Sequence, residues 1–361
     1  MVIRRWLDSA ISELRLPEII AERCVHAHAE VASCRACLDA CPHEAWVIDD
    51  DALGIDSSLC DGCGLCSAAC PQAAIVSDGE PAVMRYKESM VALARCEQTN
   101  GEVEQLPSDR KISCIHSLGF RDLARMAAED VFALYFYTGD CDHCQRGEAL
   151  RLEQRLLQIN YLLNASERPV VSLYRLNQRQ WSNLLSSLQS AEQGKKSTRR
   201  LFMRQGLAQM ATQLLPDLQL SDHERGAIQT PTQILSIDKQ KSRALHSPAI
   251  DSRLCDGCDA CVRLCPQSAI QLMIDDQLTQ YTINSHGCTG CRLCVDICEN
   301  RALSLQSPSV SGGTTTLLLY SARCRICGVP FHRPAIQDVE SNLCHVCRKV
   351  NHKRNLFKVL P

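Results

Sequence analysis

The chain has 361 residues, of which 24 are cysteine, a thiol content far above that of an ordinary soluble domain. Lys and Arg number 39 against 41 Asp and Glu, which gives a formal net charge of -2 and argues against a nucleic-acid-binding protein. Aromatic residues make up only 4%, so a large aromatic core is not indicated.

Residues 1–22 predict an N-terminal amphipathic helix, because apolar side chains between Ile3 and Leu14 recur at helical spacing. They lack the continuous apolar stretch of a secretory signal. The longest apolar run, 131–137, is far shorter than the ~20 residues of a membrane span. We therefore expect a cytoplasmic protein without a membrane span, in which closely spaced cysteines bind metal rather than form disulfides.

Four cysteine runs share one spacing and occur as two pairs, within residues 23–81 and 250–308. They are Cys34, Cys37 and Cys41; Cys60, Cys63, Cys66 and Cys70; Cys255, Cys258, Cys261 and Cys265; and Cys288, Cys291, Cys294 and Cys298. Residues 47–56 and 271–285 alternate enough to predict a short hairpin in each pair. Each pair is thus expected to form a small α+β module.

The two pairs closely resemble the bacterial two-cluster ferredoxins, whose ligand run is C-x2-C-x2-C-x3-C-P. Gly62, Gly64, Gly257 and Gly290 suit this role, since small residues allow the backbone to approach a buried cluster. Zinc sites are disfavoured here because interleaved runs of three plus one cysteines are not typical of them. The resemblance implies four 4Fe-4S clusters, two in each module.

In that family the fourth cysteine of each run binds the cluster of the partner run. Carried over by position, three implied ligand sets are Cys60, Cys63, Cys66 and Cys41; Cys255, Cys258, Cys261 and Cys298; and Cys288, Cys291, Cys294 and Cys265. Glu299 stands where a proline usually follows the last cysteine, but that position ligates nothing, so the third of these sets is expected to be complete.

The fourth set lacks one ligand, because Val31 stands where its first cysteine would be. Its remaining members are Cys34, Cys37 and Cys70. We expect Cys24, seven residues upstream, to complete the set, with His26 or His28 as alternative ligands and a 3Fe-4S cluster as a further alternative.

Residues 82–181 predict a small parallel α/β domain, since apolar runs such as 90–94, 111–115, 131–137 and 170–174 alternate with helical patterns at 120–129 and 145–164. Four cysteines stand at or just after the ends of these strands, at the sheet edge where open α/β folds bind ligands. They are Cys96, Cys114, Cys141 and Cys144.

Three interpretations of these four thiols stay open. A fifth iron-sulfur or zinc site would use all four, a dithiol redox site at Cys141 and Cys144 would need only two, and buried cysteines are often inert. The segment 82–175 resembles the iron-sulfur delta subunit of methyl-viologen-reducing hydrogenases, which has a similar Gly-x-Cys-x-x-Cys turn. His116 and His143 are expected to form local hydrogen bonds rather than to bind metal.

Residues 182–249 are polar and predict a linker that contains one helix, near 200–215. The pair Arg199 and Arg200 resembles a twin-arginine export motif, but it is internal and no apolar stretch follows it.

Residues 320–361 hold two C-x2-C knuckles separated by 16 residues, a zinc-ribbon-like pattern. The four thiols are Cys324, Cys327, Cys344 and Cys347. We expect a structural zinc or, as in rubredoxin, a single iron. The surrounding basic residues suit an acidic protein partner, and His332 and His345 are interpreted as ordinary surface residues.

The expected fold is thus α+β multidomain, with two ferredoxin-like 2x 4Fe-4S modules flanking a parallel α/β domain and a C-terminal zinc ribbon. No phosphate-binding loop or catalytic triad accompanies them. The leading hypothesis is a polyferredoxin-like subunit of a hetero-oligomeric oxidoreductase, which relays single electrons between a donor and an acceptor protein. The alternatives are a cytoplasmic accessory ferredoxin that assists maturation of a redox enzyme, and an iron-sulfur oxidoreductase with its catalytic site at the four middle thiols.

Overall fold

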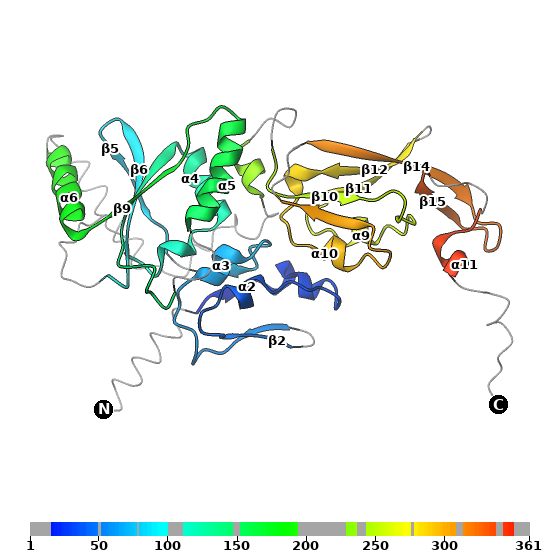
Figure 1. Cartoon of the computed structure of the whole chain (residues 1–361), viewed down its shortest axis with the longest axis horizontal. Helices are drawn as coiled ribbons and strands as arrows, with labels where there is room; N and C mark the ends of the chain where they lie inside the picture. The colour runs from blue at the N-terminus through cyan, green and yellow to red at the C-terminus, as the bar shows by residue number, and fades with distance from the viewer. Residues whose placement is uncertain are drawn as a thin grey trace, which may run out of the picture.

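The computed structural model describes residues 16–49, 52–77, 79–99, 111–146, 152–193, 229–236, 243–275, 278–307, 313–336 and 342–349. These ranges include all 24 cysteines. We call the first pair of cysteine runs, within residues 23–81, together with its surrounding elements module 1, and the second pair, within residues 250–308, together with its surrounding elements module 2. Figure 1 shows module 1 in blue below the α/β domain, module 2 beside them in yellow and orange, and the orange-red C-terminal hairpin at the far end. No helix within the described ranges is long and apolar enough to cross a bilayer.

Module 1 is organised around a very small apolar core. Its elements are β1 (Glu18–Ile19), α2 (Ala36–Asp39), β2 (Trp46–Asp49), β3 (Ala52–Ile55), α3 (Leu65–Ala69) and β4 (Ile75–Val76). Strand β1 pairs antiparallel with β4, and β2 with β3, which confirms the predicted hairpin. The buried cluster consists of Cys37, Trp46, Cys66 and Ile75. Half of it is cysteine, so sulfur occupies space that aliphatic side chains fill in other domains.

The helix predicted over residues 1–22 is wrong for residues 16–22, which form no α-helix. Residues 1–15 lie outside the described residues. Glu18 and Ile19 form a strand against Val76 and Ile75. A 3-10 turn, η1 (Ala21–Arg23), follows it. A strand is favoured here because pairing with β4 at the other end of the module satisfies the backbone hydrogen bonds of Glu18 and Ile19.

Module 2 repeats the plan of module 1. Its elements are β10 (Ser247–Ile250), α9 (Ala260–Arg263), β11 (Ile270–Ile274), β12 (Thr279–Asn284), η5 (Ser285–Gly287), α10 (Leu293–Asp296) and β13 (Leu303–Gln306). The terminal strands β10 and β13 pair antiparallel, as β1 and β4 do, and β11 and β12 form the second predicted hairpin.

The middle domain has a five-stranded sheet whose strands run parallel from β6 to β9. The strands are β5 (Ala82–Tyr86), β6 (Ser89–Cys96), β7 (Lys111–Ile112), β8 (Val131–Tyr137) and β9 (Ser172–Leu176). Strand β6 pairs in parallel with β7 and β8, and β8 with β9. Strand β5 is an antiparallel edge strand that the sequence interpretation missed.

Helices cover both faces of this sheet. They are α4 (Phe120–Ala128), α5 (Leu152–Ala165) and α6 (Gln178–Gln193). Alternate residues of β6 face opposite layers: Ala92 and Ala94 pack with α4 and α5, whereas Val91 and Leu93 pack with α6. This arrangement fixes the ends of the parallel strands, where the middle thiols lie.

The linker predicted at 182–249 is in part a piece of the folded core. The boundary after residue 181 falls inside α6, whose Trp181, Leu185 and Leu188 are buried against the sheet. Helix α8 (Pro231–Ile234) packs beside α4, with Leu235 in the larger core cluster. The helix expected near 200–215 lies outside the described residues.

The C-terminal region begins earlier than the predicted residue 320. Strand β14 (Thr314–Arg323) pairs with β12, and β15 (Pro330–Pro334) pairs with β14, which extends the β11–β12 hairpin to a four-stranded sheet. A short helix, α11 (His345–Lys349), follows. The tail is therefore continuous with module 2 rather than a separate unit.

Core packing of the middle domain can be tested on one helix. Leu162 and Leu157 both lie on α5, but they are 0% and 72% exposed. Leu162→Ala is expected to lower the free energy of unfolding by about 2–5 kcal/mol, because it leaves a cavity. Leu157→Ala is expected to change it by less than about 0.5 kcal/mol. Denaturant unfolding followed by circular dichroism compares the two, and equal losses would contradict this packing.

Candidate metal centres

The three complete cysteine runs adopt the same backbone turn. In each, the residue just before the short helix has a positive φ: Gly64 at 76°, Asp259 at 63° and Arg292 at 66°. In the incomplete first run the corresponding residue, Arg35, has a φ of -125°. Left-handed residues wrap the chain tightly and cost free energy for any residue with a Cβ. The left-handed residue thus occurs in the three runs that contain all four cysteines and not in the run that lacks one.

Each run also ends in the same turn, which points a backbone N–H at its last sulfur. A residue with positive φ stands three positions after that cysteine: Glu44, Ala73, Ser268 and Arg301. The next residue is alanine and donates to Sγ at 3.2–3.4 Å: Ala45 to Cys41, Ala74 to Cys70, Ala269 to Cys265 and Ala302 to Cys298. The last of these bonds shows that Glu299 in place of proline leaves the turn intact. Hydrogen bonds of this kind stabilise a metal-bound thiolate.

One thiol group of module 1 lines a small cavity. Cys41, Cys60, Cys63 and Cys66 face it from both runs, together with Trp46. Burial raises the pKa of Cys63 and of Cys66 to about 12, and neighbouring thiols raise the pKa of Cys66 further. The protein thus gathers four thiols around one cavity, and burial disfavours the thiolate form of two of them, Cys63 and Cys66.

The second group of module 1 includes Cys24, which lies between η1 and a second 3-10 turn, η2 (Val25–Ala27). Burial raises the pKa values of Cys34, Cys37 and Cys70, and the nearby Cys24 thiol adds to the shift in all three. The His26 ring instead hydrogen-bonds the Cys34 carbonyl at 2.8 Å. Cys24 is therefore the residue that the fold brings to these three thiols.

Module 2 contains two equivalent groups. Burial raises the pKa values of six of these thiols, and members of the same group raise them further: Cys255, Cys258, Cys261, Cys288, Cys291 and Cys294. The groups are Cys255, Cys258, Cys261 and Cys298, and Cys288, Cys291, Cys294 and Cys265. In both, the last cysteine comes from the partner run.

The spacing of the sulfurs separates these groups from a single-ion site. Four thiolates around one zinc at ~2.3 Å lie about 3.8 Å apart. Over the described part of the chain, the only group of three or more ligating residues with all atoms within 4.8 Å is in the tail. No three of the described thiols in either module come this close together, which is compatible with an inorganic core of several atoms.

The four middle cysteines come together at the carboxyl ends of their strands. Cys96 ends β6, Cys114 follows β7, and Cys141 and Cys144 follow β8. Burial raises the pKa of Cys96 and of Cys141, and for both the nearby Cys144 thiol adds to the shift. All four are therefore parts of one group.

The helical pattern predicted from residue 145 would place Cys144 next to a helix, but residues 145 and 146 form a turn, and helix α5 is described from Leu152. The Leu152 N–H instead donates to Nδ1 of the buried His116 at 2.9 Å. His143 hydrogen-bonds Asp140 at 2.8 Å. His143 thus forms the local hydrogen bond that the sequence analysis predicts, whereas the bond of His116 joins it to a residue 36 positions away.

The five groups form one continuous series through the protein. Beyond burial, thiols of neighbouring groups raise one another's pKa at four places: Cys63 near Cys114, Cys37 near Cys66, Cys291 near Cys34, and Cys294 near Cys261. Figure 1 shows that the parts of the chain that carry these groups, the α/β domain, module 1 and module 2, adjoin one another.

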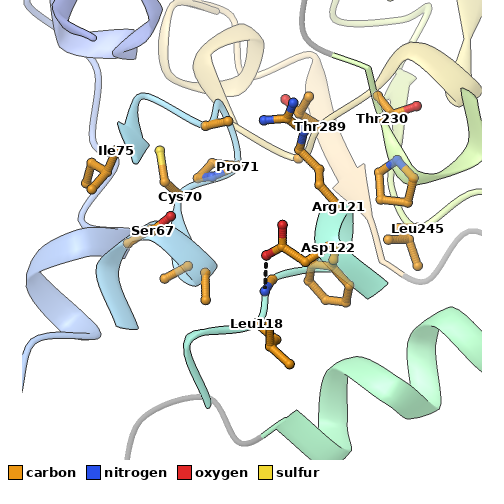
Figure 2. Close-up of a pocket in the computed structure, with 18 of the residues that line it drawn as sticks. Ser67, Cys70, Pro71, Ile75, Leu118, Arg121, Asp122, Thr230, Leu245 and Thr289 are labelled. Carbon is orange, nitrogen blue, oxygen red and sulfur yellow. Dashed lines mark hydrogen bonds between the residues drawn. The ribbon is translucent and has the colours of Figure 1, made fainter. Parts of the chain in front are cut away.

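A cavity of about 930 Å³ opens beside the centre of this series, where module 1, α4 and module 2 meet. Figure 2 shows Cys70 on one wall, with Asp122 and Arg121 from α4 opposite it. Cys34, Cys288 and Cys291 also reach the cavity. Two of the thiol groups are thus approached from the same opening.

The tail group has the geometry of a single-metal site. The sulfurs of Cys327 and Cys344 are 3.8 Å apart, the separation expected around one tetrahedral ion. The four thiols are Cys324, Cys327, Cys344 and Cys347. Backbone N–H groups, first that of Cys327, lower the pKa of Cys324, which favours the thiolate that metals bind.

The tail packs on the Cys255–Cys261 loop of module 2. His332 is not an ordinary surface residue: its Nε2 is 2.7 Å from Asp259, which also accepts a hydrogen bond from Tyr281 at 2.6 Å. Gly257 has no room for a side chain, since a Cβ there would lie 2.0 Å from the His332 carbonyl oxygen. Lys349 pairs with Glu299 at 2.7 Å. The tail therefore covers one thiol group directly.

Sequence reasoning also missed Asp61 and Arg146, which form a partly buried ion pair between module 1 and the α/β domain. Asp61 stands inside a cysteine run and Arg146 two residues after Cys144. That placement was a usable signal, but nothing in the sequence indicated that the two residues meet.

Comparison with known proteins agrees with this geometry. Residues 32–76 and residues 247–299 each match a family of 4Fe-4S dicluster domains. No curated protein matches the chain. The chain therefore contains two 4Fe-4S dicluster domains of the ferredoxin type. Their repetition in one polypeptide indicates an iron-sulfur electron-transfer protein.

The single-metal geometry of the tail predicts a specific loss. Cys344→Ser is expected to remove about one zinc or iron ion per chain, because three thiols do not complete a tetrahedral structural site. His345→Gln, at the adjacent residue, is expected to retain the ion. Inductively coupled plasma mass spectrometry of both purified variants measures this. Equal metal content in the two variants would overturn the assignment.

Proposed function

We propose that this protein relays single electrons between a donor and an acceptor protein, as a subunit of a larger oxidoreductase. The observation that carries the proposal is the unbroken series of thiol groups, in which thiols of adjacent groups pack in one apolar cluster at each of the four junctions. A carrier protein needs such a series because an electron must pass from centre to centre without leaving the protein. The bound clusters would supply the one-electron chemistry.

Four of these groups are proposed to hold one 4Fe-4S cluster each. The proposed ligands are Cys41, Cys60, Cys63 and Cys66; Cys24, Cys34, Cys37 and Cys70; Cys265, Cys288, Cys291 and Cys294; and Cys255, Cys258, Cys261 and Cys298. The wide spacing of the thiols, the N–H···S bonds and the left-handed turns support this assignment.

The middle group is proposed as a fifth iron-sulfur or zinc site with Cys96, Cys114, Cys141 and Cys144 as ligands. Its position supports an iron-sulfur centre over zinc, since Cys114 packs in one buried cluster with Cys63 of module 1. A zinc ion at the end of a relay would carry no electrons. The tail site is proposed to hold a structural zinc or a single iron.

Two contacts hold the adjoining groups at fixed separations. Ser33 donates through its N–H and its hydroxyl to the Asp296 carboxylate, both at 2.9 Å. Thr230 and Thr232 both donate to the His286 carbonyl. The first joins module 1 to module 2, and the second joins the segment packed on α4 to module 2. Rigid contacts of this kind suit a relay, whose rates depend on the distances between centres.

A chain with 24 cysteines suits a reducing compartment, so the proposal places this protein in the cytoplasm. Partial exposure of Cys141 and Cys144 favours one competing function, an oxidoreductase whose substrate reacts at the middle group. Redox measurements on the Cys141→Ser variant distinguish this oxidoreductase from the electron relay.

Protein purified without oxygen is expected to contain about 16 iron atoms per chain, or more if the middle group is filled. Its centres should be reduced by a low-potential donor and reoxidised by an acceptor protein, followed by absorbance and electron paramagnetic resonance. In Cys141→Ser the four dicluster centres should still be reduced and reoxidised by small-molecule donors and acceptors, since all of their own ligands are retained. Colourless protein would overturn the relay, and loss of all turnover in Cys141→Ser would favour the oxidoreductase instead.

The incomplete run gives a second prediction. Cys24→Ala is expected to lose one 4Fe-4S signal, which either disappears or becomes a 3Fe-4S signal, because only three thiols of that group remain. His26→Ala is the matched control, since His26 contacts only the Cys34 backbone in this group. Iron counts and electron paramagnetic resonance of the oxidised protein distinguish the two variants. A loss confined to His26→Ala would assign the ligand to the histidine.

A further inference from the structure

Arg146 lies at the junction between the middle group and the first group of module 1. Its side chain is buried, with the residue 7% exposed. Its Nε donates to Asp61 Oδ2 at 2.5 Å and its Nη1 donates to the Ser113 carbonyl at 2.9 Å. One guanidinium thus binds a residue inside a cysteine run of module 1 and the backbone next to Cys114.

The charge of Arg146 acts on thiols of both groups. Burial raises the pKa values of Cys63 and Cys114 to about 12, and the guanidinium opposes that rise in each. It has the same effect on Cys60 and Cys96. The residue therefore stabilises negative charge on either side of the junction.

Asp61 has the opposite effect on its own side. Beyond burial, its carboxylate raises the pKa values of Cys60 and Cys63. Its Oδ1 also accepts the Cys63 N–H at 3.1 Å, and His43 is 3.1 Å from Oδ2. The Asp61 carboxylate and the Arg146 guanidinium form a direct ion pair, so each charge faces its opposite across the junction.

We propose that the Arg146–Asp61 pair sets the reduction potential of the centre held by Cys41, Cys60, Cys63 and Cys66, and so controls electron exchange with the middle group. This inference rests on the proposed function. Reduction adds one electron, and hence one negative charge, to this centre, while the neighbouring centre that supplies the electron is oxidised by one. A buried cation beside the acceptor favours that transfer because the local dielectric constant is low.

The two charges predict opposite shifts. Arg146→Gln leaves Asp61 unbalanced and is expected to lower the potential of this centre, by about 59 mV for each tenfold change in its one-electron equilibrium. Asp61→Asn leaves Arg146 unbalanced and is expected to raise the potential. The double variant should return towards the wild-type value, and Arg146→Lys, which retains the charge, should stay near it.

The measurement is a redox titration followed by electron paramagnetic resonance on the full-length protein. The centre is identified as the signal that Cys41→Ala removes. Arg168→Gln is the control, because Arg168 binds the carbonyls of Ala127 and Leu235 and no group of the junction. The potentials of the three other dicluster centres should remain unchanged in every variant.

A purely structural role for the pair gives a different result, since either single variant breaks the same contact and both would shift the potential in the same direction. Shifts of equal sign, or none, in protein that still titrates would overturn this inference alone. Wild-type protein without any redox-active centre would overturn the proposed function as well.

Discussion

Sulfur in place of an aliphatic core is the constraint on which the rest of this structure depends. In module 1 the buried cluster includes Cys37 and Cys66, and in module 2 Cys261 takes the equivalent place. Buried thiols without a bound metal make few strong interactions, so the folding free energy of each module depends on what its sulfurs bind. The need to bind a metal centre explains why the chain adopts left-handed turns, which cost free energy, and why backbone N–H groups donate to the sulfurs.

The α/β domain is stabilised by hydrophobic packing of its sheet, and this packed sheet positions the middle group of thiols. Its sheet is covered on both faces, with Leu134 and Phe136 fully buried. Because the strands are parallel, their carboxyl ends lie at one edge, and that edge faces module 1 through Arg146 and Cys114. A domain held by ordinary hydrophobic packing thus presents four thiols at a fixed place beside a module that lacks such packing.

Local spacing predicted much of this molecule, and tertiary contacts account for the rest. The hairpins, the strands of the middle domain and the convergence of its four thiols follow from patterns within a few residues of each cysteine. The end of the N-terminal segment, the inclusion of α6 in the core and the Asp61–Arg146 pair do not. Leu185 is a clear case, since it lies in the predicted polar linker, yet it is buried between α6 and the sheet. Such positions are set by partners far away in the sequence.

The contact between the two modules joins equivalent positions of the repeat. Gln72 and Gln267 each stand two residues after the last cysteine of a run, and Gln267 Nε2 donates to Gln72 Oε1 at 3.1 Å. Cys34 and Cys291 are the second-position cysteines of their runs and share one buried cluster. Like positions that meet in this way are typical of two-fold contacts between identical subunits.

The Asp296 contact with Ser33 departs from this equivalence, because the position matching Ser33 in module 2 is Gly290, which has no side chain to bind Asp39. Glycine is needed there, since a Cβ would lie 2.6 Å from the His246 ring. The duplicated modules therefore keep the like-to-like contact that brings two thiol groups together, while the flanking positions have diverged to hold neighbouring segments. Conservation of the contact between centres, with divergence around it, is the arrangement that a relay of fixed spacing requires.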